Sequence, residues 1–141
     1  MRVYEYPFKF TSAEKNGWVI TCRDLPEAIS QAEATEDRED VASGCLQAAL
    51  EARIRHEMEL PQPSKPKARE VLIAPPAATA AKAALYVAMR EAGVSNMELA
   101  RRLGVDEKEV RRMLDPGHGS KLPRIAEAIE ALGRHLRIAL A

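Results

Sequence analysis

At 141 residues the chain has room for one ordinary domain or two small ones, and its formal net charge is zero. The charge is divided unevenly: residues 1–75 carry 10 Lys and Arg against 13 Asp and Glu, a net charge of −3, and residues 76–141 carry 11 against 8, a net charge of +3. No run approaches the length of a membrane span, and the first ten residues lack the apolar core of a signal peptide. We therefore expect a soluble cytoplasmic protein without a membrane partner.

The N-terminal third has the pattern of a small sheet. Aromatic residues alternate with others over residues 3–10, which indicates a half-buried strand, and Pro7 predicts that this strand is an edge strand or is bulged. Polar residues over 11–17 end in Asn-Gly, a hairpin turn signal. Alternation resumes over 18–23 and predicts a second strand, and residues 28–34 form a weaker candidate for a third.

A helix and one more strand complete the first half. Thr35 is placed to cap a helix whose first turn is acidic, and apolar residues follow at helical spacing from Ala42 to Met58. Pro61, Pro63 and Pro66 enforce an extended connector, after which residues 70–74 read as a strand. The fold class is therefore α+β, with the order β-β-β-α-β and the helix on one face of the sheet.

The second half is expected to be helical, and Pro75-Pro76 marks the boundary between a domain at 1–75 and one at 76–141. Helices are predicted from Thr79 to Ala92, ended by Gly93, and from Leu122 to Leu132, ended by Gly133. The tail HLRIALA alternates again and predicts a strand without a partner in its own domain, which we expect to pair with a second chain. The dimerisation residues would be Leu136, Ile138 and Leu140.

Between these helices, residues 96–114 predict a helix-turn-helix, in an all-α DNA-binding domain. Ala100 is small where two helices must approach, Gly104 suits a left-handed turn, and Asp106 can cap the second helix. A plain helical hairpin with a glycine turn is the alternative interpretation. In the DNA-reading interpretation the outward residues of the second helix are the candidate contacts, with two from the following loop: Glu107, Lys108, Arg111, Arg112, Ser120 and Lys121.

Other candidate features are better explained by structure than by chemistry. The loop DPGHGSK at 115–121 lacks the spacing of a phosphate-binding loop, and no histidine has a Cys, Asp or Glu at metal-ligand spacing. Cys22 and Cys45 are predicted to be reduced and buried. Acids at 33–40 could be a nuclease metal cluster, but a solvated helix start explains them. The alternating aromatic residues over 3–10 could stack on nucleic-acid bases, but such a row more commonly forms the buried face of a strand. We expect no catalytic residue, metal or cofactor.

The first half resembles the HicB antitoxin family through YPFKF at 6–10, GWVITCRDLPEA at 17–28, EATEDREDVASGCLQAALEARI at 33–54 and LPQPS at 60–64. The second half resembles phage-repressor helix-turn-helix domains through ELARRLGVDEKEVRRML at 98–114 and KLPRIAEAIEALGRHLRI at 121–138. The chain departs from the family pattern where a proline often precedes DLP and a glycine follows it, since Arg23 and Glu27 stand there. Glu33-Ala34-Thr35 likewise replaces a common Gly-Asp-Thr turn.

The resemblance implies a partial ribonuclease H-like first domain without catalytic acids, and an antitoxin rather than an enzyme. It implies binding and neutralisation of a HicA-type RNA-cleaving toxin, and repression of the chain's own operon through operator double-stranded DNA. Because the second half carries only +3, useful DNA binding is expected to need a homodimer or higher homo-oligomer. The alternatives are a stand-alone helix-turn-helix regulator with a ligand-sensing N-terminal domain, and a metal-dependent RNA hydrolase.

Overall fold

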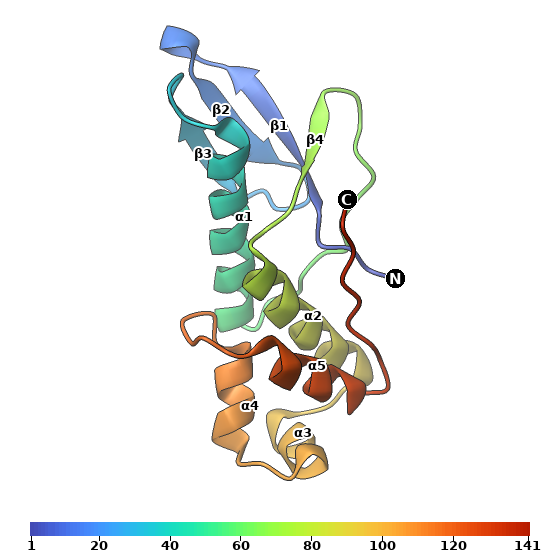
Figure 1. Cartoon of the computed structure of the whole chain (residues 1–141). Helices are drawn as coiled ribbons and strands as arrows, with labels where there is room; N and C mark the ends of the chain where they lie inside the picture. The colour runs from blue at the N-terminus through green and yellow to red at the C-terminus, as the bar shows by residue number, and fades with distance from the viewer. The chain divides into compact units, whose positions relative to one another are not determined.

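The computed structural model describes residues 1–141, which divide into two compact units, one of residues 1–53 and 59–76 and the other of residues 54–58 and 77–141. The fold is α+β, and no helix is both long and apolar enough to cross a membrane. The elements follow in the order β1 (Tyr6–Ser12), η1 (Glu14–Asn16), β2 (Trp18–Cys22), β3 (Ile29–Ala32), α1 (Arg38–Arg55), β4 (Glu70–Ile73), α2 (Ala77–Ala92), α3 (Asn96–Leu103), α4 (Glu107–Leu114) and α5 (Leu122–Glu130) (Figure 1).

The first unit contains an antiparallel sheet with the strand order β3-β2-β1-β4. The prediction that β1 is an edge or bulged strand is wrong, because β1 pairs with β2 on one side and with β4 on the other. Pro7 is compatible with this central place because the pairing with β2 begins only at Phe8, so the missing N–H takes no bond from that ladder.

The predicted hairpin joins β1 to β2, but its turn differs from an Asn-Gly turn. The left-handed residues are Lys15 (φ 55°) and Asn16 (φ 59°), whereas Gly17 has φ −83°. Gly17 is needed for another reason, since a Cβ there would lie 2.9 Å from the carbonyl oxygen of Ala32 in β3. The glycine therefore allows a close backbone approach, and its neighbours make the turn.

Helix α1 lies along one face of the sheet (Figure 1). It begins at Arg38, later than predicted, because Asp37 rather than Thr35 caps it: the Asp37 carboxylate accepts from the N–H groups of Glu39 (3.0 Å) and Asp40 (3.3 Å). Most of the apolar residues from Ala42 to Met58 that the sequence predicts to face the sheet are buried, although Met58 is 48% exposed. Helix and sheet together bury Tyr6, Phe8, Ile20, Cys22, Ala42, Leu46, Ala49 and Leu50.

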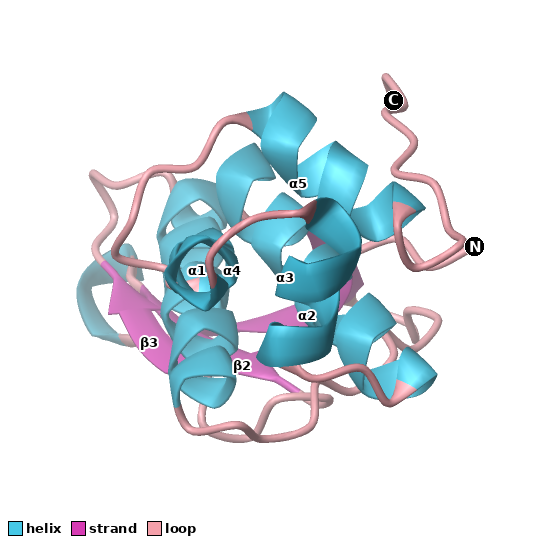
Figure 2. Ribbon diagram, turned by 90° about the horizontal axis from the view of Figure 1, so that it is seen from below, coloured by secondary structure: helices cyan, strands magenta, loops and turns pink.

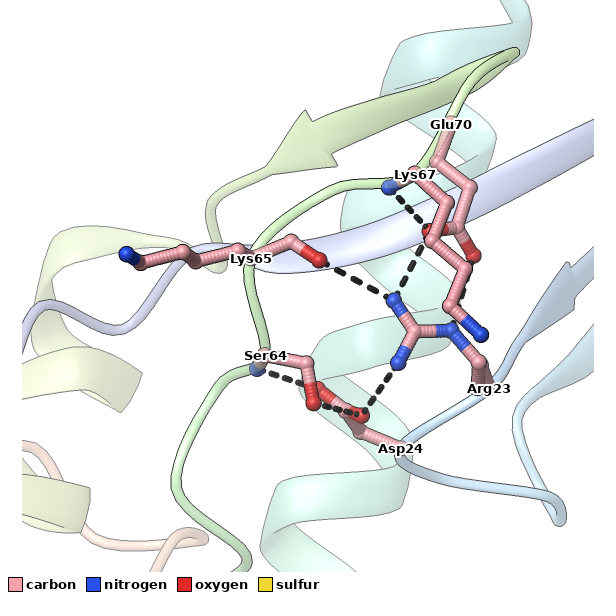
Figure 3. A network of polar contacts seen from close by, with 6 residues as sticks. All are labelled: Arg23, Asp24, Ser64, Lys65, Lys67 and Glu70. Carbon is pink, nitrogen blue, oxygen red and sulfur yellow. Dashed lines mark hydrogen bonds and ion pairs between the residues drawn. The ribbon is translucent and has the colours of Figure 1, made fainter.

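A polar network fastens the proline-rich connector to the end of β2 (Figure 3). The Arg23 guanidinium donates to both carboxylate oxygens of Glu70 (3.2 and 2.8 Å) and to the carbonyl oxygen of Lys65 (3.1 Å). The Asp24 carboxylate accepts from the N–H and the hydroxyl of Ser64, both at 2.7 Å. These bonds satisfy polar groups in a connector that forms no regular backbone ladder.

At the positions that depart from the family pattern, the side chains or backbone form two ion pairs and one hydrogen bond. Arg23 pairs with Glu70, and Glu27 forms a two-pronged pair with Arg53 of α1. At the third departure, the Glu36 carboxylate accepts from the N–H of Glu33 at 2.9 Å, which closes the turn before α1. Each of the three departures thus has a polar partner in the fold.

The Arg23–Glu70 pair predicts a specific pH dependence of stability. Hydrogen bonds from Arg23, and then from the N–H of Lys67, lower the pKa of Glu70 from 4.5 to about 2. Because the folded-state pKa is depressed, this stabilisation is present above pH 4.5 and is lost as the pH falls from 4.5 towards 2. We expect Glu70→Gln to flatten the acid limb of stability, measured by denaturant unfolding between about pH 6 and pH 2. Glu14→Gln, at an exposed position, is the control, and equal acid limbs in both variants would contradict the assignment.

The second unit is a helical bundle in which α2, α3, α4 and α5 gather around one apolar core (Figure 2). Gly93 (φ 64°) ends α2 as predicted, although α2 begins earlier, at Ala77, and Ala92 is exposed. Helix α5 ends at Glu130, two residues before the predicted end, and Gly133 (φ 79°) lies in the turn that follows. The core is formed by Ala81, Leu85, Met89, Leu99, Ala100, Val110, Met113, Ile125, Ala128 and Ile129.

Helices α3 and α4 are joined by the tight turn that the sequence predicts. Gly104 adopts the left-handed conformation (φ 66°, ψ 33°), and its N–H donates to carbonyl oxygens of α3. Asp106 caps α4 by accepting from the N–H of Lys108, and Ser95 caps α3 in the same way through Glu98. Ala100 and Val110 are buried between the helices, as predicted.

The tail from residue 134 to 141 forms no strand, which differs from the prediction. Leu136 is half-buried and packs against the core of the helical unit, whereas Ile138 (81%) and Leu140 (102%) are exposed. The alternation of apolar residues therefore does not place all of them on one free face. Backbone groups of a strand need a ladder partner, and a single chain supplies none here.

Candidate DNA interface

Helix α4 presents a cationic outer face. Lys108, Arg111 and Arg112 are exposed, and Glu107 is half-buried. Arg111 forms an ion pair with Glu107 at 2.9 Å (i, i+4), whereas the side chains of Lys108 and Arg112 form no ion pair in the chain. The predicted contact residues on α4 are thus brought onto one face, with Arg111 held by a carboxylate.

A groove of about 1070 Å3 runs beside this face, and every residue that lines it belongs to the second unit. The N-terminal turn of α3 contributes Ser95 and Asn96, and α4 contributes Lys108, Arg111 and Arg112. Arg55 and Arg90 also line it, which gives five basic side chains against the two acids Glu57 and Asp115. The excess of basic groups favours an anionic ligand.

Most other arginines of this unit form ion pairs with glutamates. Hydrogen bonds from Arg101, and then from Arg102, lower the pKa of Glu98 to about 2. Arg124 bonds to Glu109 at 2.7 Å, and Arg134 pairs with Glu91. These arginines are therefore partly neutralised by carboxylates, whereas Lys108 and Arg112 on α4 keep their charge without an ion-pair partner.

The two loop residues of the predicted interface differ from each other. Lys121 is exposed and lies just before α5. The hydroxyl of Ser120 is half-buried, accepts a bond from Lys82 at 3.0 Å and donates to the carbonyl oxygen of Arg112 at 3.3 Å. Ser120 is thus committed to contacts inside the unit, and Lys121 is the loop residue available to solvent.

The site residues predicted from the sequence did not include Lys82, Arg90 or Ser95, the residue that caps α3. A signal for Lys82 was present, because it stands with Thr79, Tyr86 and Met89 at the i, i+3, i+7 spacing of a buried stripe. A lysine at such a position needs acceptors that only another element can supply. Arg90 carried no such signal, since it follows the buried stripe at an exposed position.

The remaining candidate groups have structural partners or are isolated. No group of three or more His, Cys, Asp or Glu is arranged to hold a metal ion. The acids before α1 form turn and cap bonds through Glu36 and Asp37. Both cysteines are free, and burial raises the pKa of both thiols, but only Cys22 is buried as predicted, whereas Cys45 is half-buried.

Comparison with known proteins identifies the class of protein. A family model described as HicB_like antitoxin of bacterial toxin-antitoxin system matches residues 5–84. The chain is 35% identical over 133 residues to Antitoxin HicB 2 of Photorhabdus laumondii, which covers 94% of each protein. It is 30% identical over 139 residues to Antitoxin HicB of Pseudomonas fluorescens (98% of this chain, 94% of the relative). It is 28% identical over 135 residues to Antitoxin HicB of Escherichia coli K12 (96% and 98%).

These matches define an antitoxin of a bacterial toxin–antitoxin system. The chain belongs to the HicB-like antitoxin family. The family model covers mostly the α+β unit, whereas the alignments with the relatives extend along both units. The similarity is therefore not confined to the α+β unit.

Proposed function

We propose that the chain neutralises a HicA-type RNA-cleaving toxin through residues 1–75 and represses its own operon through a helix-turn-helix formed by α3 and α4. The observation that carries the DNA-binding part is the outer face of α4, where Lys108, Arg111 and Arg112 lie together. The N-terminus of this helix is capped, and its opposite face packs into the core of the unit. Membership of an antitoxin family supports the toxin-binding part.

The chemistry of α4 suits the major groove of DNA. That groove admits one α-helix, and a guanidinium can pair with guanine through two hydrogen bonds, worth about 1–3 kcal/mol of discrimination. Ser95 and Asn96 at the start of α3 and Lys121 beside α5 are placed on the same unit as candidates for phosphate contacts. Glu107 disfavours phosphate near α4, so we infer selective rather than general binding.

A single unit with a net charge of +3 has a small electrostatic contribution to DNA affinity. We therefore include a homodimer in the proposal, in which two α4 helices read half-sites about one helical turn, or 34 Å, apart. The exposed tail residues Ile138 and Leu140 support an interface there, because apolar side chains at 81% and 102% exposure gain most from burial.

The test uses the full chain, because residues 54–58 belong with the helical unit. Tyr86 donates to the carbonyl oxygen of Met58 at 2.6 Å and Arg90 to that of Glu57 at 3.2 Å, so a cut at residue 76 would remove these bonds. We expect the chain to co-purify with the product of a small adjacent gene, to relieve its toxicity in cells, and to shift the DNA upstream of its own gene.

The outcomes separate the two functions. Relief of toxicity without a DNA shift would leave an antitoxin that does not repress transcription. A DNA shift without a co-purifying partner would favour the stand-alone regulator. RNA cleavage that requires a divalent metal would contradict the assignment of the chain as an antitoxin without enzymatic activity.

A further inference from the structure

A charged side chain lies inside the helical unit, at the end of the proposed DNA-reading helix. Lys82 in α2 is only 5% exposed, which is unusual because a lysine is rarely buried without acceptors for its ammonium group. Its Nζ donates to the carbonyl oxygens of Arg112 and Met113 and to the hydroxyl of Ser120, each at 3.0 Å.

These acceptors are groups that α4 cannot satisfy itself. The last carbonyl groups of a helix have no partner within the helix. In α4 the carbonyl of Arg111 accepts from the N–H of Asp115 at 2.9 Å, and Lys82 takes the next two carbonyls. A positive charge at this place also faces the negative end of the helix dipole.

The same ammonium fixes the loop that follows α4. Ser120 joins it to the loop of residues 115–120, since its hydroxyl accepts from Lys82 and donates to the carbonyl of Arg112. Two further bonds to Asp115 shape the loop, from the N–H of Gly117 to the carboxylate (2.8 Å) and from the N–H of His118 to the carbonyl (3.1 Å). One buried group therefore connects α2, the end of α4 and the start of the segment that carries Lys121.

We propose that Lys82 is a positioning residue for DNA recognition, which rests on the proposed function of α4. Arg111 and Arg112 lie in the last turn of α4, next to the carbonyls that Lys82 holds. A helix of eight residues has little stability of its own, so its direction depends on such tertiary contacts. Because Lys82 is buried, it acts through the orientation of these arginines and of Lys121 and does not touch DNA.

The test replaces Lys82 by methionine, which keeps an unbranched apolar stem and removes the ammonium. We expect operator affinity to fall by about tenfold or more in the folded variant, the size expected for lost hydrogen bonds to a charged group, while toxin neutralisation is retained. Lys65→Met, which removes the same charge at an exposed site, is the matched control and should leave operator affinity unchanged.

Salt dependence separates positioning from direct contact. A lysine that neutralises a phosphate adds about 0.9 to the slope of log affinity against log salt, so its removal lowers that slope. Because Lys82 is proposed to orient Lys121, a candidate phosphate contact, the comparison is made in the Lys121→Ala background, where we expect Lys82→Met to lower the affinity with the slope unchanged. A reduced slope, or wild-type affinity in the folded variant, would overturn the proposal.

Ser120→Ala keeps the proposal testable if Lys82→Met does not fold. It removes one acceptor, and we expect a smaller loss of operator affinity and faster hydrogen exchange at the amides of Gly117 and His118. If the wild-type chain binds no operator, the DNA-binding part of the proposed function is wrong. If it does bind, unchanged exchange at these amides in Ser120→Ala would contradict the role of Lys82 itself.

Discussion

The double variant Arg111→Ala/Arg112→Ala is expected to lose operator binding while keeping its thermal stability. Both side chains are exposed, so their removal opens no cavity, and the backbone carbonyl of Arg112 that Lys82 holds is unchanged. The only ion pair lost is the exposed one to Glu107, and such pairs are worth about 0.3–0.5 kcal/mol. Two arginine–guanine contacts at about 1–3 kcal/mol each, or about 2–6 kcal/mol together, predict at least about a thirtyfold loss of affinity per site.

A mobility-shift titration and a thermal melt measure the two halves of this expectation. Lys108→Ala should have a milder effect, because a lysine serves as a phosphate or single-base contact. Arg101→Ala is the matched control, since Arg101 is exposed and engaged with Glu98 on α3. Operator binding by the double variant at wild-type affinity would exclude this face of α4 as the DNA reader.

Glu107→Gln tests the same face in the opposite direction. In the free chain the Glu107 carboxylate holds Arg111 at 2.9 Å, so DNA must compete with it. The variant releases Arg111 and removes a negative charge near phosphate, and we expect tighter binding to unrelated DNA with a smaller preference for the operator.

The second large effect is expected at the tail. If the chain forms the homodimer proposed above, we expect Ile138→Ser/Leu140→Ser to convert it to a monomer and to weaken operator binding by orders of magnitude. An isoleucine or leucine gains about 1.5–3 kcal/mol when fully buried, so four such side chains in a dimer supply about 6–12 kcal/mol. That is the size of the roughly 8 kcal/mol of a micromolar dimer, before other contacts and the cost of association are included.

The double serine variant is a sharper test than deletion of residues 135–141. Deletion would also remove Leu136, which packs against the core of its own unit, and would confuse dimerisation with folding. Met97→Ser, at a position that is 75% exposed, controls for loss of a surface apolar group. If light scattering finds the double variant dimeric at micromolar concentration, the interface lies elsewhere, with the surface of α5 the next candidate.

Local patterns in the sequence determined the elements of this protein and much of the candidate site. Alternating aromatics predicted β1, and the glycine and aspartate at 104 and 106 predicted the turn and cap between α3 and α4. The outward arginines of α4 followed from helical periodicity, because a buried Val110 and Met113 leave the opposite face exposed. These features depend on neighbours within about one or two turns, which is the range that sequence patterns report.

Tertiary structure alone decided which groups meet across long separations. It placed β1 in the centre of the sheet, since the pairing with β4 depends on a strand more than sixty residues away, whereas Pro7 by itself suggested an edge. It also joined Arg23 to Glu70 and Lys82 to the end of α4. A buried polar group takes whichever partner the packing brings within hydrogen-bond distance, and that partner leaves no periodic trace in the chain.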